Sequence, residues 1–194
     1  GVTLSDLNLG GGYGVRYTAE DEAINISARL AELAAHLKEE TEKLGLPMPR
    51  FLMEPGRSIV ADAGMTLYTV GSVKRIPGYK QYAAVDGGMT DNPRYALYQS
   101  RYTVYHAHKS GSMERFDVVG RCCESGDIIQ PGVELPGDTC RGDILAVCTT
   151  GAYNYSMASN YNRLPRPAVV MLTPDRIYEA VRRETFADLT ALDL

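Results

Sequence analysis

The sequence lacks tryptophan, has only three phenylalanines and three histidines, and contains no long apolar run. No stretch approaches the ~18 apolar residues that a membrane-spanning helix needs, and the N-terminus does not read as a signal peptide. Its 20 basic and 24 acidic residues give a net charge of -4, and the basic residues are scattered. This charge gives no electrostatic reason to expect nucleic acid or an anionic membrane as a partner.

Cysteine is also sparse. The chain has four, with no CxxC and no Cys/His spacing of the kind that binds metal: Cys122, Cys123, Cys140 and Cys148. Two of them are adjacent, which does not suit a simple disulfide framework. We therefore expect no metal site, and a reducing, cytoplasmic location.

The first sixty residues have the pattern of a strand, a helix and a strand. The segment 2–9 alternates apolar and polar residues, and Thr18 with Asp21 predicts that a helix opens there. Gly45 is placed to end it, and 51–53 is a short apolar strand. Parallel strands joined by a crossover helix are the expected arrangement. The buried stripe of the helix is expected at Ile26, Leu30, Leu33 and Leu37.

Beyond about residue 63 the pattern changes to short β-rich runs separated by turn residues. This predicts a β-sandwich or barrel with one short helix near 186–192. The predicted fold is thus α/β followed by all-β, with domains at 1–62 and 63–194. The predicted strands are 65–73, 81–85, 102–106, 116–119, 144–148 and 169–172.

Two loops follow the predicted parallel strands. Glycines at 10–14 lie between a strand and the predicted helix, where free N–H groups and the helix dipole favour an anion; a plain tight turn fits equally well. The spacing matches neither a Rossmann nor a Walker motif. Glu54-Pro55-Gly56-Arg57 follows the second strand, so both loops are expected at one edge, with Gly11, Gly12, Gly56 and Arg57 around a phosphate. A surface salt bridge within a turn is the alternative for Glu54 and Arg57.

Five segments carry a resemblance, in this order: LNLGGGYG, EPGRSIV, DGGMTDNPRYALY, CCESGD and TGAYNYSMASNYN. Together they resemble the alanine-racemase-like barrel decarboxylases that use pyridoxal 5'-phosphate, and among these the diaminopimelate decarboxylases. Ornithine-type relatives typically have Asp after the active-site Cys, where this chain has Glu124. The resemblance implies that the chain is the last part of a (β/α)8 barrel followed by a C-terminal β-domain.

The resemblance also implies roles for single residues. Glu54 faces the pyridine nitrogen of the cofactor, and Cys123 protonates the carbon that loses CO2. Without the resemblance, Tyr153 reads as a half-buried core tyrosine. The implied cofactor contacts are Gly11, Gly12, Glu54, Pro55, Gly56, Arg57 and Tyr153. The implied substrate contacts are Arg57, Arg94, Tyr98, Glu124 and Tyr153.

The chain has five lysines, and none follows a buried strand into the predicted phosphate edge. The resemblance places the lysine that binds the cofactor before residue 1, so we expect an inactive fragment of a longer enzyme. That enzyme is expected to convert meso-2,6-diaminopimelate to L-lysine, as a homodimer with shared active sites. A decarboxylase of the same fold acting on ornithine, arginine or carboxynorspermidine is one alternative. A non-enzymatic carrier or regulator of pyridoxal phosphate is the other.

Overall fold

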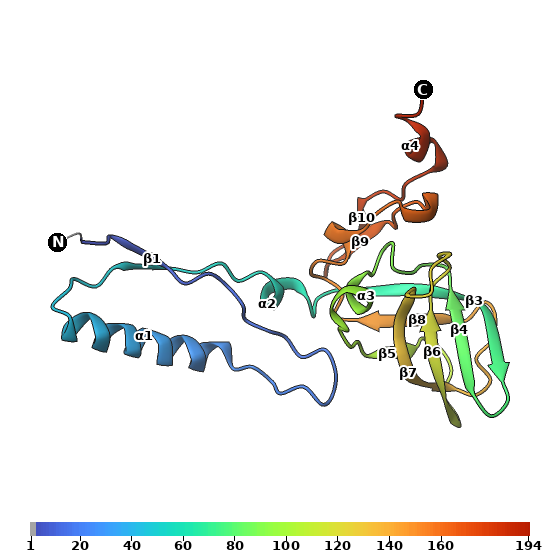
Figure 1. Ribbon diagram of the computed structural model, residues 1–194, viewed down its shortest axis with the longest axis horizontal. Coiled ribbons are helices and arrows are strands. Elements are labelled where there is room, and N and C mark those ends of the chain that lie inside the picture. Colours follow the sequence, from blue (N-terminus) through green and yellow to red (C-terminus); the bar gives the residue numbers. More distant parts are fainter. Residues whose placement is uncertain (1–2) are drawn as a thin grey trace.

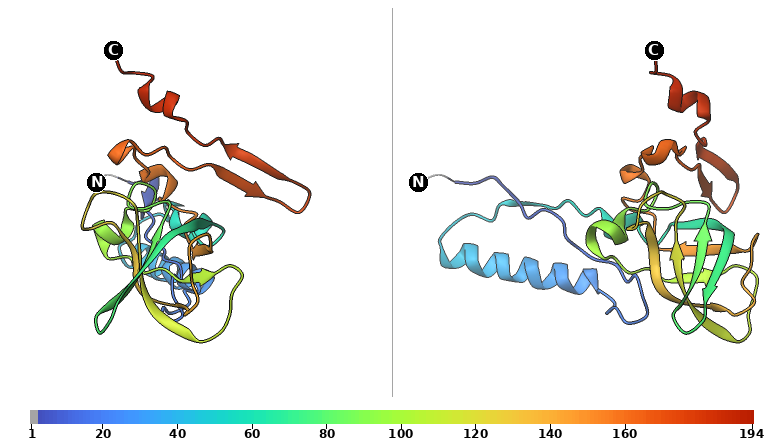
Figure 2. Two further views of the ribbon diagram at one scale, coloured as in Figure 1. Left: turned by 90° about the vertical axis from the view of Figure 1, so that its right-hand side faces the viewer. Right: turned by 45° about the vertical axis from the view of Figure 1, so that its right-hand side comes forward.

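The computed structural model describes residues 3–194 and shows an elongated molecule (Figure 1). A strand-helix-strand unit lies at one end and a six-stranded sheet at the other. A C-terminal hairpin projects from the sheet (Figure 2). No helix among residues 3–194 is long and apolar enough to cross a membrane.

The N-terminal unit consists of strand β1 (Asp6–Asn8), helix α1 (Ile26–Lys43) and strand β2 (Arg50–Leu52). The two strands pair in parallel, with Leu7 opposite Phe51, as the sequence predicts; residue 2 of the expected first strand lies outside the described residues. The predicted apolar stripe of α1 is half-buried, while the flanking positions of the helix are exposed.

The predicted start of this helix is wrong. Thr18 and Asp21 form a turn in which the Thr18 N–H donates to Asp21 Oδ2 (2.8 Å), and the chain then continues without helical structure. The helix begins at Ile26, where the Asn25 side chain caps it by accepting the Ala28 N–H (3.0 Å). At the other end Gly45 has φ +63, the left-handed conformation that terminates helices, as predicted.

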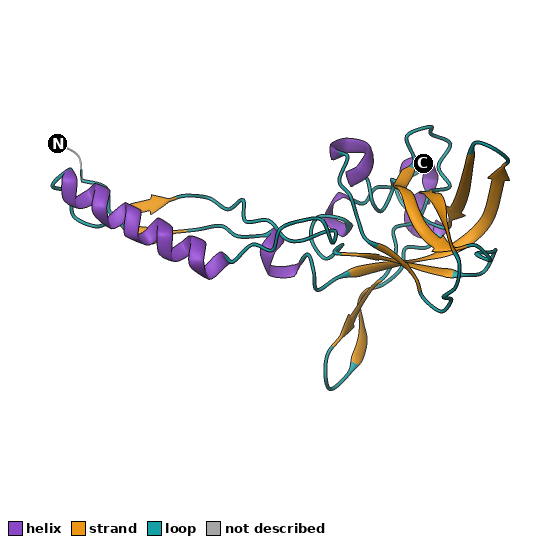
Figure 3. Ribbon diagram, turned by 90° about the horizontal axis from the view of Figure 1, so that it is seen from below, coloured by secondary structure: helices purple, strands orange, loops and turns teal. Residues whose placement is uncertain are grey.

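Six strands form the β-domain in the order β5-β8-β3-β4-β6-β7. Figure 3 shows this sheet at the end of the molecule away from the long helix α1. Neighbouring strands are antiparallel except for β4 and β6. The Tyr102 N–H donates to Gln130 Oε1 (2.8 Å), which joins the segment before β5 to β7 and nearly closes the sheet into a barrel. The sequence analysis missed β7. The strands are β3 (Met65–Ile76), β4 (Lys80–Val85), β5 (Val104–His106), β6 (Met113–Val119), β7 (Ile128–Pro136) and β8 (Ile144–Cys148).

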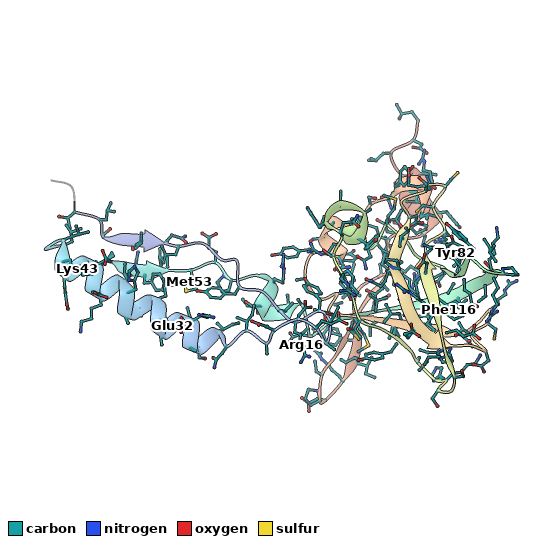
Figure 4. The ribbon with its side chains drawn as sticks, turned by 60° about the horizontal axis from the view of Figure 1, so that its bottom comes forward. Arg16, Glu32, Lys43, Met53, Tyr82 and Phe116 are labelled. Atoms are coloured by element: carbon teal, nitrogen blue, oxygen red, sulfur yellow. The ribbon has the colours of Figure 1, made fainter. Side chains whose placement is uncertain are left out.

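The core lies inside this curved sheet. Its side chains come from every strand, and Phe116 is the largest of those fully buried. Figure 4 places Phe116 and Tyr82 in the sheet, and Glu32 and Lys43 along α1 at the other end of the molecule. Tyr17 packs against this core from the N-terminal part of the chain. The all-β character predicted beyond residue 63 is confirmed.

Short helices and a hairpin complete the structure. Helix α2 (Arg57–Val60) and helix α3 (Arg94–Tyr98) precede β3 and β5, and 3-10 turns occupy Tyr155–Met157 (η1) and Tyr161–Arg163 (η2). The hairpin strands are β9 (Val169–Leu172), as predicted, and β10 (Ile177–Val181), which the sequence analysis missed. Helix α4 (Phe186–Thr190) matches the predicted last helix and begins at a capping box formed by Thr185 and Asp188.

We expect Phe116→Ala to lower the free energy of unfolding by about 3–5 kcal/mol, because it leaves a cavity at a position with 0% exposure. Phe186→Ala is the matched control, since that ring is 75% exposed, and should change stability by less than about 0.5 kcal/mol. Urea unfolding followed by circular dichroism measures both. Equal losses in the two variants would contradict the assignment of the core.

Candidate active site

Two arginines meet at one tyrosine where α2, α3 and the segment after β8 converge. Arg57 is the first residue of α2, and its guanidinium carbon lies 5.6 Å from the centre of the Tyr153 ring. Arg94 opens α3 and lies 5.3 Å from the same ring and 5.2 Å from that of Tyr98. These are cation–π distances. They surround a pocket of about 490 Å³ lined by Arg57, Arg94, Tyr98, Ser100, Tyr153 and Met157.

Neither arginine has an acidic partner within the described part of the chain. Arg94 is only 6% exposed, and no carboxylate of residues 3–194 lies within 4.0 Å of the guanidinium of Arg57 or Arg94. The Nε of each is buried without a hydrogen-bond partner. A buried cation without a counter-charge is costly, so this pocket favours an anionic ligand.

A layer of buried polar side chains lies behind Arg94. Burial raises the pKa of Tyr102, although the positive charge of Arg94 works against this shift. Tyr102 is therefore a neutral phenol near neutral pH. Tyr17 contacts it edge-on, with ring centres 5.4 Å apart. Asn154 is also buried. The sequence analysis missed Tyr102 and Asn154, because a buried polar residue inside a β-rich segment has no distinctive local pattern.

Close backbone approaches fix Arg57 relative to Tyr153. A Cβ at Gly64 would fall on the backbone of Gly151, so both positions need glycine. The Gly151 N–H donates to Ala61 O (2.9 Å) and the Thr150 N–H to Gly64 O (3.0 Å). The segment after β8 is thereby joined to the end of α2. Tyr153 itself has φ +73, a left-handed conformation that is costly for a bulky side chain.

The glycine-rich loop and the Glu54 loop touch, as predicted for two loops after parallel strands. A Cβ at Gly11 would fall on Glu54 O, and the Glu54 N–H donates to Gly10 O (2.8 Å). Asn8, which the sequence analysis missed, donates from Nδ2 to Glu54 Oε1 (2.6 Å). The helix-dipole argument for this loop is wrong, because α1 begins only at Ile26. The loop offers backbone groups and open space instead, since nothing lies within 4 Å of a Cβ at Gly12.

Asp127 holds together the two loops that flank β4 and β6. The residue is 4% exposed, and its carboxylate accepts the N–H groups of Met89 and Cys122, each at 2.6 Å. A Cβ at Gly88 or Gly120 would fall on this carboxylate. Asp127 is the last residue of the CCESGD segment. The resemblance therefore included this residue, but no role was predicted for it.

Cys123 and Glu124 are exposed, and neither lines the 490 Å³ pocket of their own chain. The structure therefore brings together Arg57, Arg94 and Tyr153 but leaves this loop apart from them. The adjacent thiol differs: burial, followed by the nearby Asp127 carboxylate, raises the pKa of Cys122 to about 11. Cys122 therefore stays protonated at neutral pH and is unsuited to proton exchange.

A larger hollow of about 920 Å³ lies at the β3–β4 turn, and none of the predicted site residues lines it. Two pairs of its polar side chains bond to each other: Lys80 Nζ lies 2.6 Å from Asp117 Oδ2, and Gln81 Nε2 donates to Glu114 Oε2 (2.7 Å). Gln81 Oε1 is the one side-chain atom of its lining that is buried without a hydrogen-bond partner among residues 3–194, whereas the arginine pocket has the Nε atoms of both arginines.

Residues 16–151 match the model of the family described as pyridoxal-dependent decarboxylase, C-terminal sheet domain. The chain belongs to this pyridoxal-dependent decarboxylase family. The resemblance noted from the five sequence segments is thus confirmed.

Individual relatives point the same way. The chain is 49% identical to a diaminopimelate decarboxylase of Bacillus subtilis over 97% of its own length and 43% of that protein. It also superposes on diaminopimelate decarboxylase of M. jannaschii in complex with L-lysine, with TM-score 0.92 and 34% identity over 100% of the chain and 44% of that structure. Its superposition on a lysine/ornithine decarboxylase of Vibrio vulnificus has a TM-score of 0.71 and 27% identity, over 82% of the chain and 42% of that structure. The chain therefore spans less than half the length of these relatives.

The residues present fit the cofactor that the family name implies. Gly11 permits contact between the two loops, and the open space at Gly12 suits a phosphate. Glu54 has one oxygen held by Asn8, which orients a carboxylate at the same edge. Next to it, a Cβ at Gly56 would lie 3.4 Å from the Tyr153 hydroxyl. A continuous surface thus runs from the glycine loop to the arginine pocket.

We expect Gly120→Ala to lower the free energy of unfolding by about 1–3 kcal/mol, because the added methyl displaces the Asp127 carboxylate. Gly71→Ala is the control, since its nearest atom would be the Ala84 carbonyl oxygen at an ordinary 3.7 Å. Amide hydrogen exchange should also show faster exchange at Met89 and Cys122 in the Gly120 variant alone. Unchanged exchange at both amides would contradict the central role of Asp127.

Proposed function

We propose that the intact enzyme removes one carboxylate from meso-2,6-diaminopimelate to give L-lysine, with pyridoxal 5'-phosphate as cofactor. The unpaired arginines at Tyr153 are the observation that carries this proposal. Diaminopimelate has an amine and a carboxylate at the end that does not react, whereas ornithine has only the amine. Arg94, buried and without an acidic partner, matches the extra carboxylate.

The proposed cofactor contacts follow the surface from the glycine loop to Tyr153. Gly11, Gly12, Pro55 and Gly56 supply backbone around the phosphate, and Arg57 supplies charge. Pyridoxal phosphate, when bound, withdraws electrons from the bond that breaks. Glu54 would pair with the ring nitrogen and favour its protonated form, and the amide of Asn8 holds the Glu54 carboxylate in place (2.6 Å).

The proposed substrate contacts are Arg57, Arg94, Tyr98 and Tyr153 in the pocket, with Glu124 accepting hydrogen bonds from the distal ammonium. The C–C bond to the departing carboxylate breaks and releases CO2. Cys123 then delivers the proton that forms the new C–H bond, and its thiolate regains a proton from solvent.

We further propose that this enzyme is a homodimer whose active sites combine residues of both subunits. Cys123 and Glu124 are exposed and absent from the lining of their own pocket, which supports their delivery to a partner's pocket. A two-fold dimer generates two such sites at once.

We also propose that residues 1–62 belong to the barrel domain and residues 63–194 to the β-domain, and that the enzyme is cytoplasmic. Strand β3 begins at Met65, soon after this boundary, although Tyr17 crosses it by packing on the sheet core. All four cysteines are unpaired, as a reducing compartment favours.

We expect Arg94→Lys in the full-length enzyme to lower kcat/KM for meso-diaminopimelate about 10- to 100-fold, because an ammonium cannot form the paired hydrogen bonds of a guanidinium. The control is Arg101→Lys, an exposed arginine 3.4 Å from Glu20, which should stay within about twofold. CO2 release measures both variants. Faster turnover of ornithine than of meso-diaminopimelate by the unmodified enzyme would overturn the substrate assignment.

Shared sites predict complementation between two inactive full-length variants, Cys123→Ala and Arg57→Ala. In a mixed dimer one site carries both defects and the other neither, so activity should return to about a quarter of the wild-type value at equal mixing. If each site belongs to one subunit, every site keeps a defect. Persistent inactivity, with mixed dimers verified by native mass spectrometry, would refute the shared site.

A further inference from the structure

The loop that carries Cys123 is held from two sides. On one side the Cys122 N–H donates to Asp127 Oδ2 (2.6 Å). On the other side the Cys123 N–H donates to the side-chain oxygen of Asn162 (2.7 Å), which lies 39 positions away in the sequence, in η2. The backbone amide of the proposed proton donor is therefore bound by a residue outside its own loop.

Asn162 is itself fixed in place. Its backbone has φ +56, a left-handed conformation that asparagine tolerates better than most residues. The next residue, Arg163, donates to Leu189 O (2.9 Å) and contacts Asp193 (3.0 Å) at and beyond α4. Just before it, Asn160 donates to Glu184 Oε2 (2.7 Å). The side-chain oxygen is thus presented to Cys123 from a turn anchored on both flanks.

The two supports of the Cys123 loop also meet each other. Asp127 accepts the Met89 N–H, and the neighbouring Thr90 accepts the Ser159 N–H through its carbonyl oxygen (2.8 Å). The contacts form a closed ring that passes from Asp127 through the Met89 turn and the η2 segment back to the loop. Removing Asn162 would open this ring at the cysteine itself.

We propose that Asn162 is a positioning residue for Cys123, acting through the hydrogen bond from the Cys123 N–H to its side-chain oxygen. The proposal rests on the proposed function, because that function gives the thiol its task. The left-handed backbone by itself would suit either asparagine or glycine at this position, whereas only asparagine supplies a hydrogen-bond acceptor. If the backbone conformation alone mattered, Asn162→Gly would leave the Cys123 loop unchanged; if the hydrogen bond matters, this substitution loosens the loop.

The test compares Asn162→Gly, Asn162→Asp and unmodified full-length holoenzyme. Glycine keeps the left-handed backbone and removes the acceptor, whereas aspartate keeps an acceptor oxygen. Ser159→Ala is a control in the same exposed segment. The quantity measured is the rate at which iodoacetamide alkylates Cys123, followed by peptide mass spectrometry. The measurement is made at a pH high enough that this rate no longer rises with pH, so that the charge added by aspartate does not change the fraction of thiolate. The exposed Cys140 is an internal reference.

We expect Asn162→Gly to raise the Cys123 rate relative to Cys140 roughly 2- to 10-fold, the effect of losing one hydrogen bond. In the same variant kcat for meso-diaminopimelate should fall by a similar factor while KM stays within twofold. In Asn162→Asp the alkylation rate of Cys123 should equal that of the unmodified enzyme. Ser159→Ala should leave both this rate and kcat unchanged.

Three results would overturn the proposal: an unchanged Cys123 rate in Asn162→Gly, an Asn162→Asp variant that behaves like the glycine variant, or equal changes at Cys123 and Cys140. Should the glycine variant not fold, amide hydrogen exchange in the unmodified enzyme decides instead: slow exchange of the Cys123 N–H supports the proposal, and exchange as fast as that of an unbonded exposed amide contradicts it. If the unmodified enzyme releases no CO2 from any amino acid, the proposed function fails. The alkylation rates then still decide whether Asn162 holds the loop.

Discussion

The carboxylate of Asp127 joins the parts of the chain from which the candidate site is built. It accepts N–H groups from Met89 and Cys122 and has glycine against it at positions 88 and 120. The turn that contains Met89 leads directly into α3. The position of Arg94 and the conformation of the Cys123 loop therefore depend on the same buried carboxylate. Asp127 directly precedes β7, and its carbonyl oxygen accepts the N–H of Gly120, which directly follows β6. A change at Asp127 would disturb the arginine pocket and the Cys123 loop together.

Close backbone contact plays the corresponding role for the other half of the site. Gly64 against Gly151 fixes α2 relative to the Tyr153 segment, and Gly11 against Glu54 O fixes the two loops at the end of the parallel strands. These contacts involve no side chain, so they leave the pocket surface to Arg57 and Tyr153. They also explain why the site segments contain glycine where ordinary turns would accept many residues.

Sequence patterns predicted those features that depend on local periodicity. The α1 stripe follows from a spacing of 3.6 and most strands from short β-rich runs between turn residues. The Gly45 terminus follows from the preference of helix ends for glycine, and the parallel pairing from the strand-helix-strand order. The predicted start of α1 was wrong because Thr18 and Asp21 form a capping-like turn with no helix after it, and the residue that caps the helix is Asn25. Strand β7 was missed because Pro131 and Gly132 interrupt its pattern, although the proline lies within a strand next to a register shift.

Some residues of the candidate site could likewise be predicted from the sequence, and others could not. The segments that resemble known decarboxylases brought forward Arg57, Arg94 and Tyr153, and the structure places these three together. The residues that support the site act over long sequence separations, as Asn162 does for Cys123 and as Gly64 and Gly151 do for α2 and the Tyr153 segment, so no local pattern reveals them. Five non-glycine residues among the described positions have left-handed backbone, and four of them lie in the segment after β8: Thr149, Tyr153, Asn162 and Arg163. Such conformations persist only where surrounding contacts outweigh their cost, and this segment contacts α2, the Met89 turn and the Cys123 loop. The strain is therefore concentrated where a single short segment must satisfy three neighbours at once, which is also where the proposed chemistry needs fixed geometry.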